Sequence, residues 1–242
     1  MKRLTTGNGA ASRPDPNLPN PKPAGEGVDA RRLSGRSAIV TGATSGIGLG
    51  LARAFAAEGA DVLLQGPACG AIDRVCAELR ALHGVRVVHA PIDLRSPERI
   101  HALAELARER FGKIDIVVNN AGVGRLATAH DPRDGAVAIE VLAAAFHLIR
   151  AVVPEMKLRR WGRIINVAAA QCFDASPCRA AYLAARHGMI GLSRAVELDG
   201  AAFGVTARTL CFDDELAPPA DELFALAVHL AADDAAHHLT HH

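Results

Sequence analysis

Short apolar runs alternate with longer amphipathic segments along most of the chain. The runs, of which SAIVTG and ADVLLQ are the first two, are rich in Val, Ile and Leu and show no regular alternation with polar residues. Such runs are typical of strands that are buried on both faces of a parallel sheet. The segments between them repeat apolar residues at helical spacing. The alternation therefore predicts an α/β fold in which helices cover both faces of a parallel sheet.

The same pattern gives approximate boundaries for each element. The expected strands lie at 37–42, 60–65, 85–94, 113–122 (running into a loop), 162–168 and 205–211. The expected helices lie at 48–59, 69–84, 96–112, 134–158, 180–201 and 220–232. Because parallel strands share one carboxyl edge, ligands are expected at that edge of the sheet.

Residues that favour helix ends support several of these boundaries. Ser96 can cap a helix through its hydroxyl group, and Pro97 suits the first helical position. Gly59, Gly84 and Gly112 follow three of the expected helices. Glycine readily adopts the left-handed conformation that ends a helix, so these positions predict C-terminal caps.

The first 34 residues differ in composition from the rest. They contain five prolines between positions 14 and 23 and few apolar residues, so burial cannot offset the entropy of ordering them. We expect a disordered Pro-rich tail at 1–34 and a single domain at 35–242; a docking arm or an organelle-targeting segment remains an alternative for the tail. No apolar run suits a membrane span or a secretory signal, so a cytoplasmic protein without a membrane partner is expected.

The overall composition argues against several other classes of partner. The 242 residues carry a net charge of +1 and 4% aromatic residues, which favours no nucleic acid. The five cysteines include no CxxC pair, so free thiols are expected rather than disulfides or a zinc site. Histidines gather at the end of the chain, where we expect a polar terminus and no metal: His237, His238, His241 and His242.

A glycine-rich loop lies between the first expected strand and the first expected helix. Its sequence, TGATSGIG, contains Gly42, Gly46 and Gly48. Glycines at such a junction permit a tight turn and let a pyrophosphate approach the backbone and the helix N-terminus; a helix-packing turn without a ligand is the alternative. Asp93, at the expected end of the third strand, and NNAG (119–122), after the fourth, lie at the same sheet edge.

These motifs resemble those of a known family. TGATSGIG, NNAG, GRIINVA and YLAAR, in this order and spacing, resemble the short-chain dehydrogenase/reductase family from about residue 36 to 240. AAYLAARHGMIGLSRAVEL and MKLRRWGRIINVA are most similar to its 3-hydroxybutyrate dehydrogenase branch. The resemblance implies a three-layer Rossmann-type doubly wound parallel sheet that binds NAD or NADP. It also implies hydride transfer between that cofactor and a small hydroxy acid, alcohol or ketone.

The resemblance also implies roles for particular residues in holding the cofactor. Asp93 would contact the adenine and Asn120 the ribose side. NADP-preferring relatives often carry a basic residue where this chain has Ser45, and the second strand ends in Gln65 without an Asp or Arg, so NAD is expected. The complete implied set for cofactor binding is Gly42, Ser45, Gly46, Ile47, Gly48, Asp93, Asn120, Gly122 and Arg186.

The catalytic residues that the resemblance implies are only partly present. In the family, a tyrosine gives a proton to the carbonyl oxygen, a lysine four residues later supports it, and a serine and an asparagine assist. Tyr182 is the only tyrosine of the chain, and Arg186 stands where the lysine would be. Arginine keeps the charge but differs from lysine in shape and acidity; a solvent-facing helix arginine is the alternative. Ala169 and Val141 occupy the serine and asparagine positions.

The C-terminal part departs further from the family pattern. Phe212-Asp213 replaces a Pro-Gly that relatives carry near the nicotinamide, and only ELAPPAD joins this strand to the last helix, so the substrate lobe is nearly absent. The chain also ends at HHLTHH, where relatives continue into a last strand. We therefore expect a sheet that lacks this strand and has an exposed edge.

Two functions remain open at this point. The first is an NAD(P)-dependent oxidoreductase that uses Tyr182 and Arg186, with activity that is weak or lost. The second is a non-catalytic partner subunit of a heteromeric dehydrogenase or a cofactor-binding structural protein; a gene product that has lost its function is a third possibility. In either of the first two, a homodimer or heterodimer is expected through the long helices before Gly162 and after Tyr182. The substrate stays unknown.

Overall fold

The computed structural model describes residues 31–121, 132–169, 180–212 and 220–232. Predictions that concern Gly122, Asp213, the tail before Arg31 and the C-terminal histidines lie outside these residues. The compact unit begins at Arg31. Leu33, before the expected domain boundary, is fully buried and donates its N–H to the main-chain oxygen of Glu58, at 2.9 Å. The folded domain therefore includes a few residues that the composition had placed in the tail.

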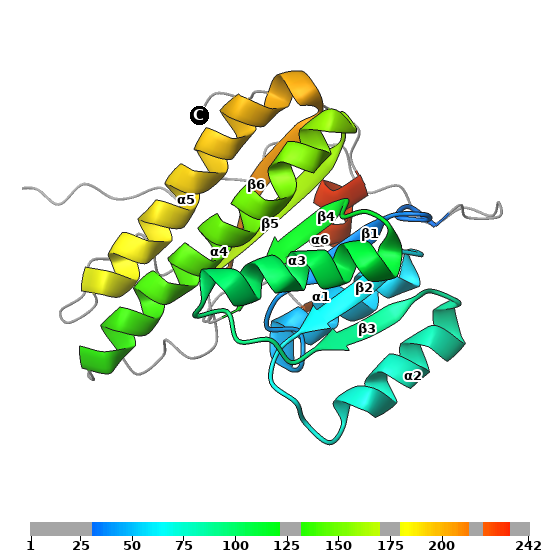
Figure 1. Ribbon diagram of the computed structural model, residues 1–242. Helices are drawn as coiled ribbons and strands as arrows, with labels where there is room; N and C mark the ends of the chain where they lie inside the picture. Colours follow the sequence, from blue (N-terminus) through cyan, green and yellow to red (C-terminus); the bar gives the residue numbers. More distant parts are fainter. Residues whose placement is uncertain (1–30, 122–131, 170–179, 213–219, 233–242) are drawn as a thin grey trace, which may run out of the picture. The chain divides into compact units, whose positions relative to one another are not determined.

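The centre of this domain is a parallel six-stranded sheet (Figure 1). Every described strand pair is parallel, and the strand order is β3-β2-β1-β4-β5-β6. This order confirms the doubly wound Rossmann-type sheet predicted from the sequence, because the chain moves outward in one direction from β1 and then in the other from β4. The strands are β1 (Ser37–Val40), β2 (Asp61–Gln65), β3 (Val87–Ala90), β4 (Ile116–Asn119), β5 (Gly162–Ala169) and β6 (Val205–Phe212).

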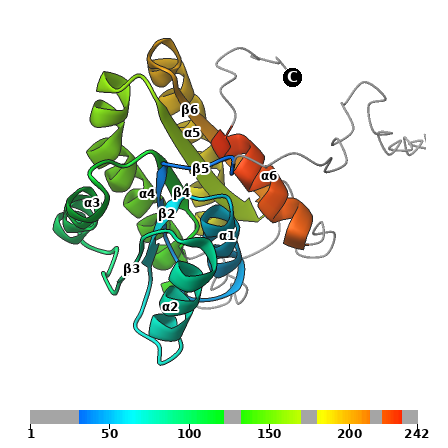
Figure 2. The ribbon, with the colours of Figure 1, turned by 90° about the vertical axis from the view of Figure 1, so that its right-hand side faces the viewer.

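Helices cover both faces of the sheet (Figures 1 and 2). On one face α1, α2 and α6 contribute buried apolar residues to a common core cluster. On the other face α3 and α4 contribute to a second cluster, against which residues of α5 also pack. The helices are α1 (Gly46–Ala57), α2 (Ile72–His83), α3 (Pro97–Phe111), α4 (Pro132–Leu158), α5 (Ala180–Gly200) and α6 (Ala220–Ala232), with a short 3-10 helix at Ala201–Phe203.

The two core clusters explain why the strands are apolar throughout. In β1, Ala38 and Val40 belong to the cluster under α1, whereas Ile39 between them belongs to the cluster under α3 and α4. Successive side chains of a strand point to opposite faces. Both faces are covered here, so neither set can be polar.

The predicted helix ends are largely confirmed. The Ser96 hydroxyl accepts a hydrogen bond from the N–H of Arg99, at 3.4 Å, and Pro97 is the first residue of α3. Gly112 and Gly84 end α3 and α2 in the left-handed conformation, with φ values of 84° and 69°. Gly59, one residue after the cap of α1, also has a positive φ of 87°.

The expected end of the third strand is wrong. The strand ends at Ala90 instead of reaching Asp93. Ala90 pairs with Gln65, which is the last residue of β2, so the neighbouring strand ends at the same level. Pro91 follows directly and has no N–H to extend the ladder. Asp93 therefore lies on the connection between β3 and α3 rather than in the sheet.

Candidate cofactor and active site

The glycine loop lies at the carboxyl edge of the sheet, between β1 and α1. Gly42 has φ +63° and Gly46 has φ +53°, conformations that side chains rarely adopt. At Gly48 a Cβ atom would collide with the Gly42 carbonyl and the Asn120 amide. At Gly46, by contrast, a Cβ atom would meet nothing within 4 Å. The loop is thus closely packed against the protein on one side and open on the other.

The start of α1 is suited to an anionic ligand. Its N-cap residue, Ser45, is exposed and makes no side-chain hydrogen bond to the helix. The first N–H groups of a helix have no acceptor within the helix, and its N-terminus is electropositive. Gly46 is also exposed, whereas Ile47 is half-buried and packs on the core. A phosphate above Gly46 could therefore accept hydrogen bonds from the first turn of α1.

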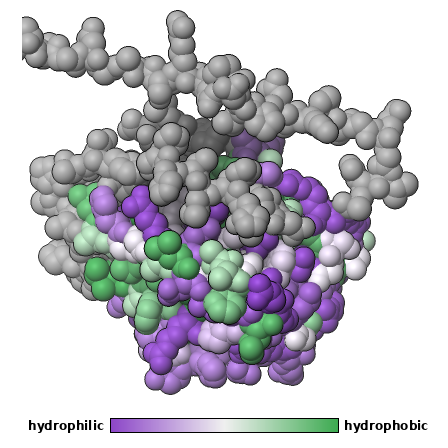
Figure 3. All heavy atoms as spheres, turned by 90° about the horizontal axis from the view of Figure 1, so that it is seen from above, coloured by the Kyte–Doolittle hydropathy of each residue, from purple (hydrophilic) through white to green (hydrophobic). Residues whose placement is uncertain are grey.

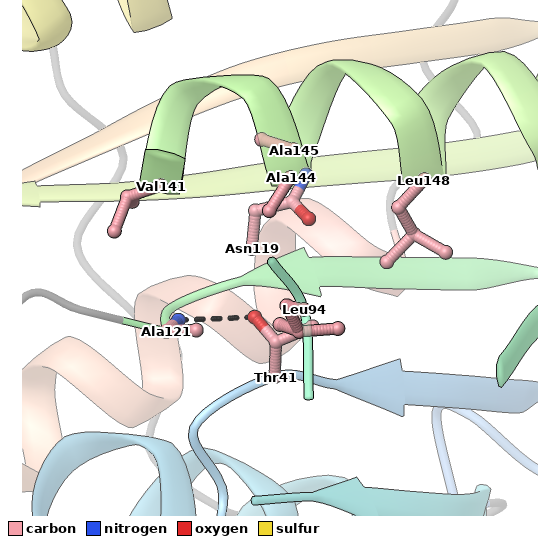
Figure 4. A pocket seen from close by; sticks show the side chains of 8 residues that line it. All are labelled: Thr41, Leu94, Asn119, Ala121, Val141, Ala144, Ala145 and Leu148. Carbon is pink, nitrogen blue, oxygen red and sulfur yellow. Dashed lines mark hydrogen bonds between the residues drawn. The ribbon is translucent and has the colours of Figure 1, made fainter. Parts of the chain in front are cut away.

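Thr41 and Asn120 fix the loop to the end of β4. The Thr41 hydroxyl oxygen accepts a hydrogen bond from the N–H of Asn120, at 2.9 Å. It accepts another from the N–H of Ala121, at 3.0 Å (Figure 4). The Asn120 side chain donates to the carbonyls of Thr41 and Gly42, at 3.0 and 3.3 Å. Asn120 is only 6% exposed. Its amide therefore holds the backbone of Thr41 and Gly42, and its contact with a ribose stays a prediction.

Gln65 joins the same loop to the segment that carries Asp93. Its Oε1 accepts a hydrogen bond from the N–H of Gly42, at 3.0 Å, and its Nε2 donates to the Ile92 carbonyl, at 2.6 Å. The sequence by itself indicates only that this position carries no charge. The pairing depends on the distance between two loops that are far apart in the chain, so no local pattern could have indicated it.

A cleft of about 590 Å³ opens beside this bridge. It is lined by the end of β2, the connection after β3 and one side of α4, including Gln65, Asp93, Arg95, Glu140 and Val141. Hydrogen bonds from the Arg95 side chain and N–H lower the pKa of Asp93 from 3.8 to about 2. The shortest contact between the two side chains is 2.5 Å. At neutral pH Asp93 is therefore an anionic acceptor at the rim of the cleft.

A much smaller cavity lies beneath α4 and is drawn in Figure 4. Its volume of about 10 Å³ corresponds to roughly one water molecule. Val141 and Ala144 close it from α4, while Thr41 and Asn119 line it from the sheet. The position that the resemblance gives to an asparagine thus presents an apolar side chain to this cavity.

A chain of buried polar side chains connects the sheet to α5. Asn119 donates to Asn166, at 2.7 Å, and Asn166 donates to Ser193 on α5, at 2.8 Å. The Ser193 hydroxyl donates to the Met189 carbonyl, at 3.0 Å, and lies 2.7 Å from the Thr209 hydroxyl on β6. The chain joins β4, β5, α5 and β6, so it sets the position of the helix that carries Tyr182.

Arg186 is buried at the carboxyl half of β5. Its side chain is 4% exposed, and its guanidinium donates to the Val167 carbonyl, at 3.2 Å. The alternative of a solvent-facing arginine is therefore wrong. Tyr182 lies one turn earlier on α5, and Ala169 is the last residue of β5. The side chains of these two residues lie outside the described part, so the predicted pairing of Tyr182 with Arg186 stays a prediction.

The free edge of β6 is partly covered by a side chain. Glu197 of α5 accepts a hydrogen bond from the N–H of Ala207, at 2.6 Å, and forms an ion pair with Arg208, also at 2.6 Å. Within the described residues no strand pairs with β6 on its outer side. Glu197 thus accepts the hydrogen bond of an N–H group that an additional strand would use.

The long helices α4 and α5 lie side by side (Figure 1) and carry exposed apolar residues. On α4, Ile139 and Phe146 are each 47% exposed, and on α5 Leu198 is 75% exposed. On the face shown in Figure 3, apolar residues form separate spots among polar ones rather than one continuous patch.

The described residues offer neither a cluster of metal ligands nor a membrane span. Among them, no group of three or more His, Cys, Asp and Glu side chains could hold a metal ion. In the same part of the chain, no helix is long and apolar enough to cross a membrane.

Comparisons with known sequences agree with this geometry. The sequence model of the family described as short chain dehydrogenase matches residues 36–212. A D-beta-hydroxybutyrate dehydrogenase of Rhizobium meliloti is 41% identical over 181 residues, 73% of this chain and 70% of that protein. A protein of the same name from Cupriavidus necator is 42% identical over 184 residues, 74% of this chain and 70% of that protein.

Solved structures give the same fold. A metagenomic short-chain oxidoreductase in complex with NADP superimposes with a TM-score of 0.74 at 29% identity, covering 84% of this chain and 94% of that one. A gluconate 5-dehydrogenase from Burkholderia cenocepacia, in complex with NADP and tartrate, also has a TM-score of 0.74, at 30% identity over 85% of this chain and 92% of that one.

Proposed function

Because this chain belongs to the short-chain dehydrogenase family, we propose that it binds a nicotinamide dinucleotide at the carboxyl edge of β1, β2 and β4. The glycine loop carries this proposal. Gly46 leaves open space above the loop, and the first turn of α1 has no side-chain cap, so its N–H groups are available to a pyrophosphate. Asp93 lies at the rim of the adjoining cleft, where it can accept a hydrogen bond from an adenine amino group.

We propose NAD rather than NADP as the preferred cofactor. A 2′-phosphate group is best held by a positive charge, and neither Ser45 in the loop nor Gln65 at the end of β2 supplies one. The guanidinium of Arg95 is already paired with Asp93. The two solved relatives named above hold NADP, so the preference rests on the residues of this chain.

The reaction we propose is hydride transfer to or from a small hydroxy acid, alcohol or ketone. The names of the two relatives from Rhizobium meliloti and Cupriavidus necator favour a hydroxy acid. A bound nicotinamide supplies or accepts the hydride. Tyr182 would exchange the proton with the substrate oxygen. Arg186 would supply a positive charge one helical turn away, with its guanidinium held by the Val167 carbonyl.

The activity is proposed to be weak or lost. Ala169, at the position of the serine, offers no hydroxyl group to the substrate oxygen, and Val141 offers no amide to a water beneath α4. Removing a single donor to a developing oxyanion typically costs on the order of 10²–10³ in rate. Arg186 adds a further cost, because a guanidinium does not exchange its proton near neutral pH.

A non-catalytic partner subunit is the second candidate function. It is favoured by the exposed apolar residues on α4 and α5, which would pack against a second copy or against a catalytic relative. In this case the bound dinucleotide would stabilise the fold rather than react. Either function is proposed for the cytoplasm.

The first experiment is a calorimetric titration of the full chain with NADH and, separately, NADPH. Micromolar binding of NADH that exceeds binding of NADPH supports both parts of the cofactor proposal. Tighter binding of NADPH would reject the NAD preference alone. If neither binds, the dinucleotide proposal is rejected for the isolated chain.

A further inference from the structure

We propose that Gln65 is a positioning residue that holds the glycine loop and the adenine side of the cleft in one arrangement before the cofactor arrives. The inference rests on the proposed binding of a nicotinamide dinucleotide. It concerns a side chain that makes no direct contact with the ligand but aligns the two segments that do.

The geometry of Gln65 carries this inference. Gln65 is the last residue of β2 and is 6% exposed, so its amide lies in a largely dry environment. Its side chain joins two segments that are far apart in the sequence. One contains Gly42, in the glycine loop, and the other contains Ile92, next to Asp93. The main-chain oxygen of Gln65 accepts a third hydrogen bond, from the N–H of Ala43, at 2.8 Å. One side-chain bond therefore ends on Gly42, which is itself in the proposed cofactor-binding set, and the other ends next to Asp93, which is also in it.

Only a side chain that both accepts and donates can make this bridge. The Gly42 N–H needs an acceptor, and the Ile92 carbonyl needs a donor. A carboxylate supplies acceptors alone, a thioether supplies neither to a useful degree, and a protonated carboxyl group supplies one of each. The two bonds also fix the orientation of the amide, with its oxygen toward the glycine loop.

A direct contact with the adenosine ribose is the competing explanation. In dinucleotide-binding folds, an acidic residue in this region accepts a hydrogen bond from the ribose hydroxyl group. In that role a carboxylate would bind the cofactor better than an amide. In the bridging role a carboxylate would weaken cofactor binding, because it has no donor for the Ile92 carbonyl and its negative charge would repel that oxygen. The two explanations therefore predict opposite effects of ionising a carboxyl group at this position.

The test measures NADH affinity of Gln65→Met and Gln65→Glu by calorimetry in the full chain. Gln65→Met is expected to weaken NADH binding about tenfold, because two bridging hydrogen bonds are lost. Gln65→Glu is expected to bind weakly at high pH and to recover most of the wild-type affinity as the pH falls through the pKa of the introduced carboxyl group. Since burial raises the pKa of a carboxyl group, this recovery should occur above the ordinary pKa of Glu.

Other charged groups around this position define the controls. Asp93, Arg95 and Glu140 line the cleft, and the His89 ring lies 3.1 Å from the Gly66 carbonyl; the glycine loop itself carries no charge. The wild type titrated over the same pH range measures the contribution of these groups. Arg80→Met is the matched control, because the Arg80 guanidinium also donates to a main-chain carbonyl, that of Val87, but at the start of β3 rather than after its end. It should leave NADH affinity unchanged.

The outcomes separate the two proposals. If the wild type does not bind NADH, the dinucleotide proposal fails and this inference fails with it. If the wild type binds and Gln65→Met binds equally well, only the inference is overturned. Tighter binding by Gln65→Glu at high pH than at low pH would also overturn it, in favour of a direct ribose contact. A thermal unfolding curve for each variant identifies any that do not fold. If Gln65→Met does not fold, the NADH affinity of Gln65→Glu at low pH, compared with its affinity at high pH, decides whether the inference holds.

Discussion

The proposed cofactor site has a nucleotide end, at the glycine loop, and a catalytic end, at the start of α5. The two ends differ in which of the expected groups are present. At the nucleotide end, Gly42, Gly46 and Gly48 have the conformations or close contacts that require glycine, and Thr41 and Asn120 brace them. At the proposed catalytic end, the supporting structure is equally well bonded, but Ala169 and Val141 stand where the resemblance implies a serine and an asparagine.

The buried frame beneath the catalytic end sharpens this contrast. Asn119, Asn166 and Ser193 form an unbroken chain of hydrogen bonds that positions α5, and Arg186 is anchored on β5. Buried polar groups are costly unless they are paired. The groups that hold this frame together are thus present, whereas Ala169 and Val141 stand at positions that the resemblance gives to groups acting on a substrate. A protein that binds a dinucleotide but reacts slowly fits this distribution.

The largest expected effect comes from rebuilding the catalytic end. Ala169→Ser, Val141→Asn and Arg186→Lys together should raise carbonyl reductase activity with NADH by on the order of 10²–10³-fold, the usual effect of one restored oxyanion donor. Steady-state rates on a panel of small ketones measure this, with Arg186→Lys alone as the control. No gain would instead place the defect near Phe212-Asp213 or in the segment before the last helix, where the resemblance implies a longer substrate lobe.

Damage to the nucleotide end is the next test of the contrast. Gly48→Ala should weaken NADH binding by more than tenfold and destabilise the fold by about 1–3 kcal/mol, because the added methyl group collides with Gly42 and Asn120. Gly70→Ala is the control, since a Cβ atom there meets nothing within 4 Å. Calorimetry and thermal unfolding report the two effects. If both variants have the same NADH affinity and the same thermal stability, the loop accommodates the added methyl group and the prediction is wrong.

The polar frame beneath α5 predicts a stability effect. Asn166→Ala should lower the free energy of unfolding by about 1–3 kcal/mol, because Asn119 and Ser193 both lose a partner in a dry interior. Urea unfolding measures it. Adding Asn119→Ala should cost less than the sum of the two single changes, because the groups are coupled. Strict additivity would show that the hydrogen bonds act independently.

The smallest expected effect concerns pH and Asp93. Its pKa is depressed to about 2 by Arg95, so the pairing contributes stability above the ordinary pKa of 3.8, and this contribution disappears as the pH falls from 3.8 towards 2. The pair is exposed, so Asp93→Asn should cost no more than about 1 kcal/mol near neutral pH. Urea unfolding at several pH values checks this. A difference from wild type that stays constant down to pH 2 would contradict the assignment.

The sequence by itself determined the order and type of the elements. Strands that are covered on both faces must be apolar throughout, so runs such as SAIVTG could be recognised without their partners. Ser96, Pro97 and the glycines at 84 and 112 mark helix ends through local backbone preferences. The glycine loop was recognisable for the same reason, since its conformation depends on the residues themselves.

Only the tertiary structure decided which distant groups meet. Pro91 and the end of β2 stop β3 before Asp93, and the bridge made by Gln65 depends on the separation of two loops. The burial of Arg186 and the capping of Ala207 by Glu197 likewise depend on how α5 packs on the sheet. Such contacts join residues that are far apart along the chain or lie on different elements. Their geometry is set by packing, which no local preference encodes.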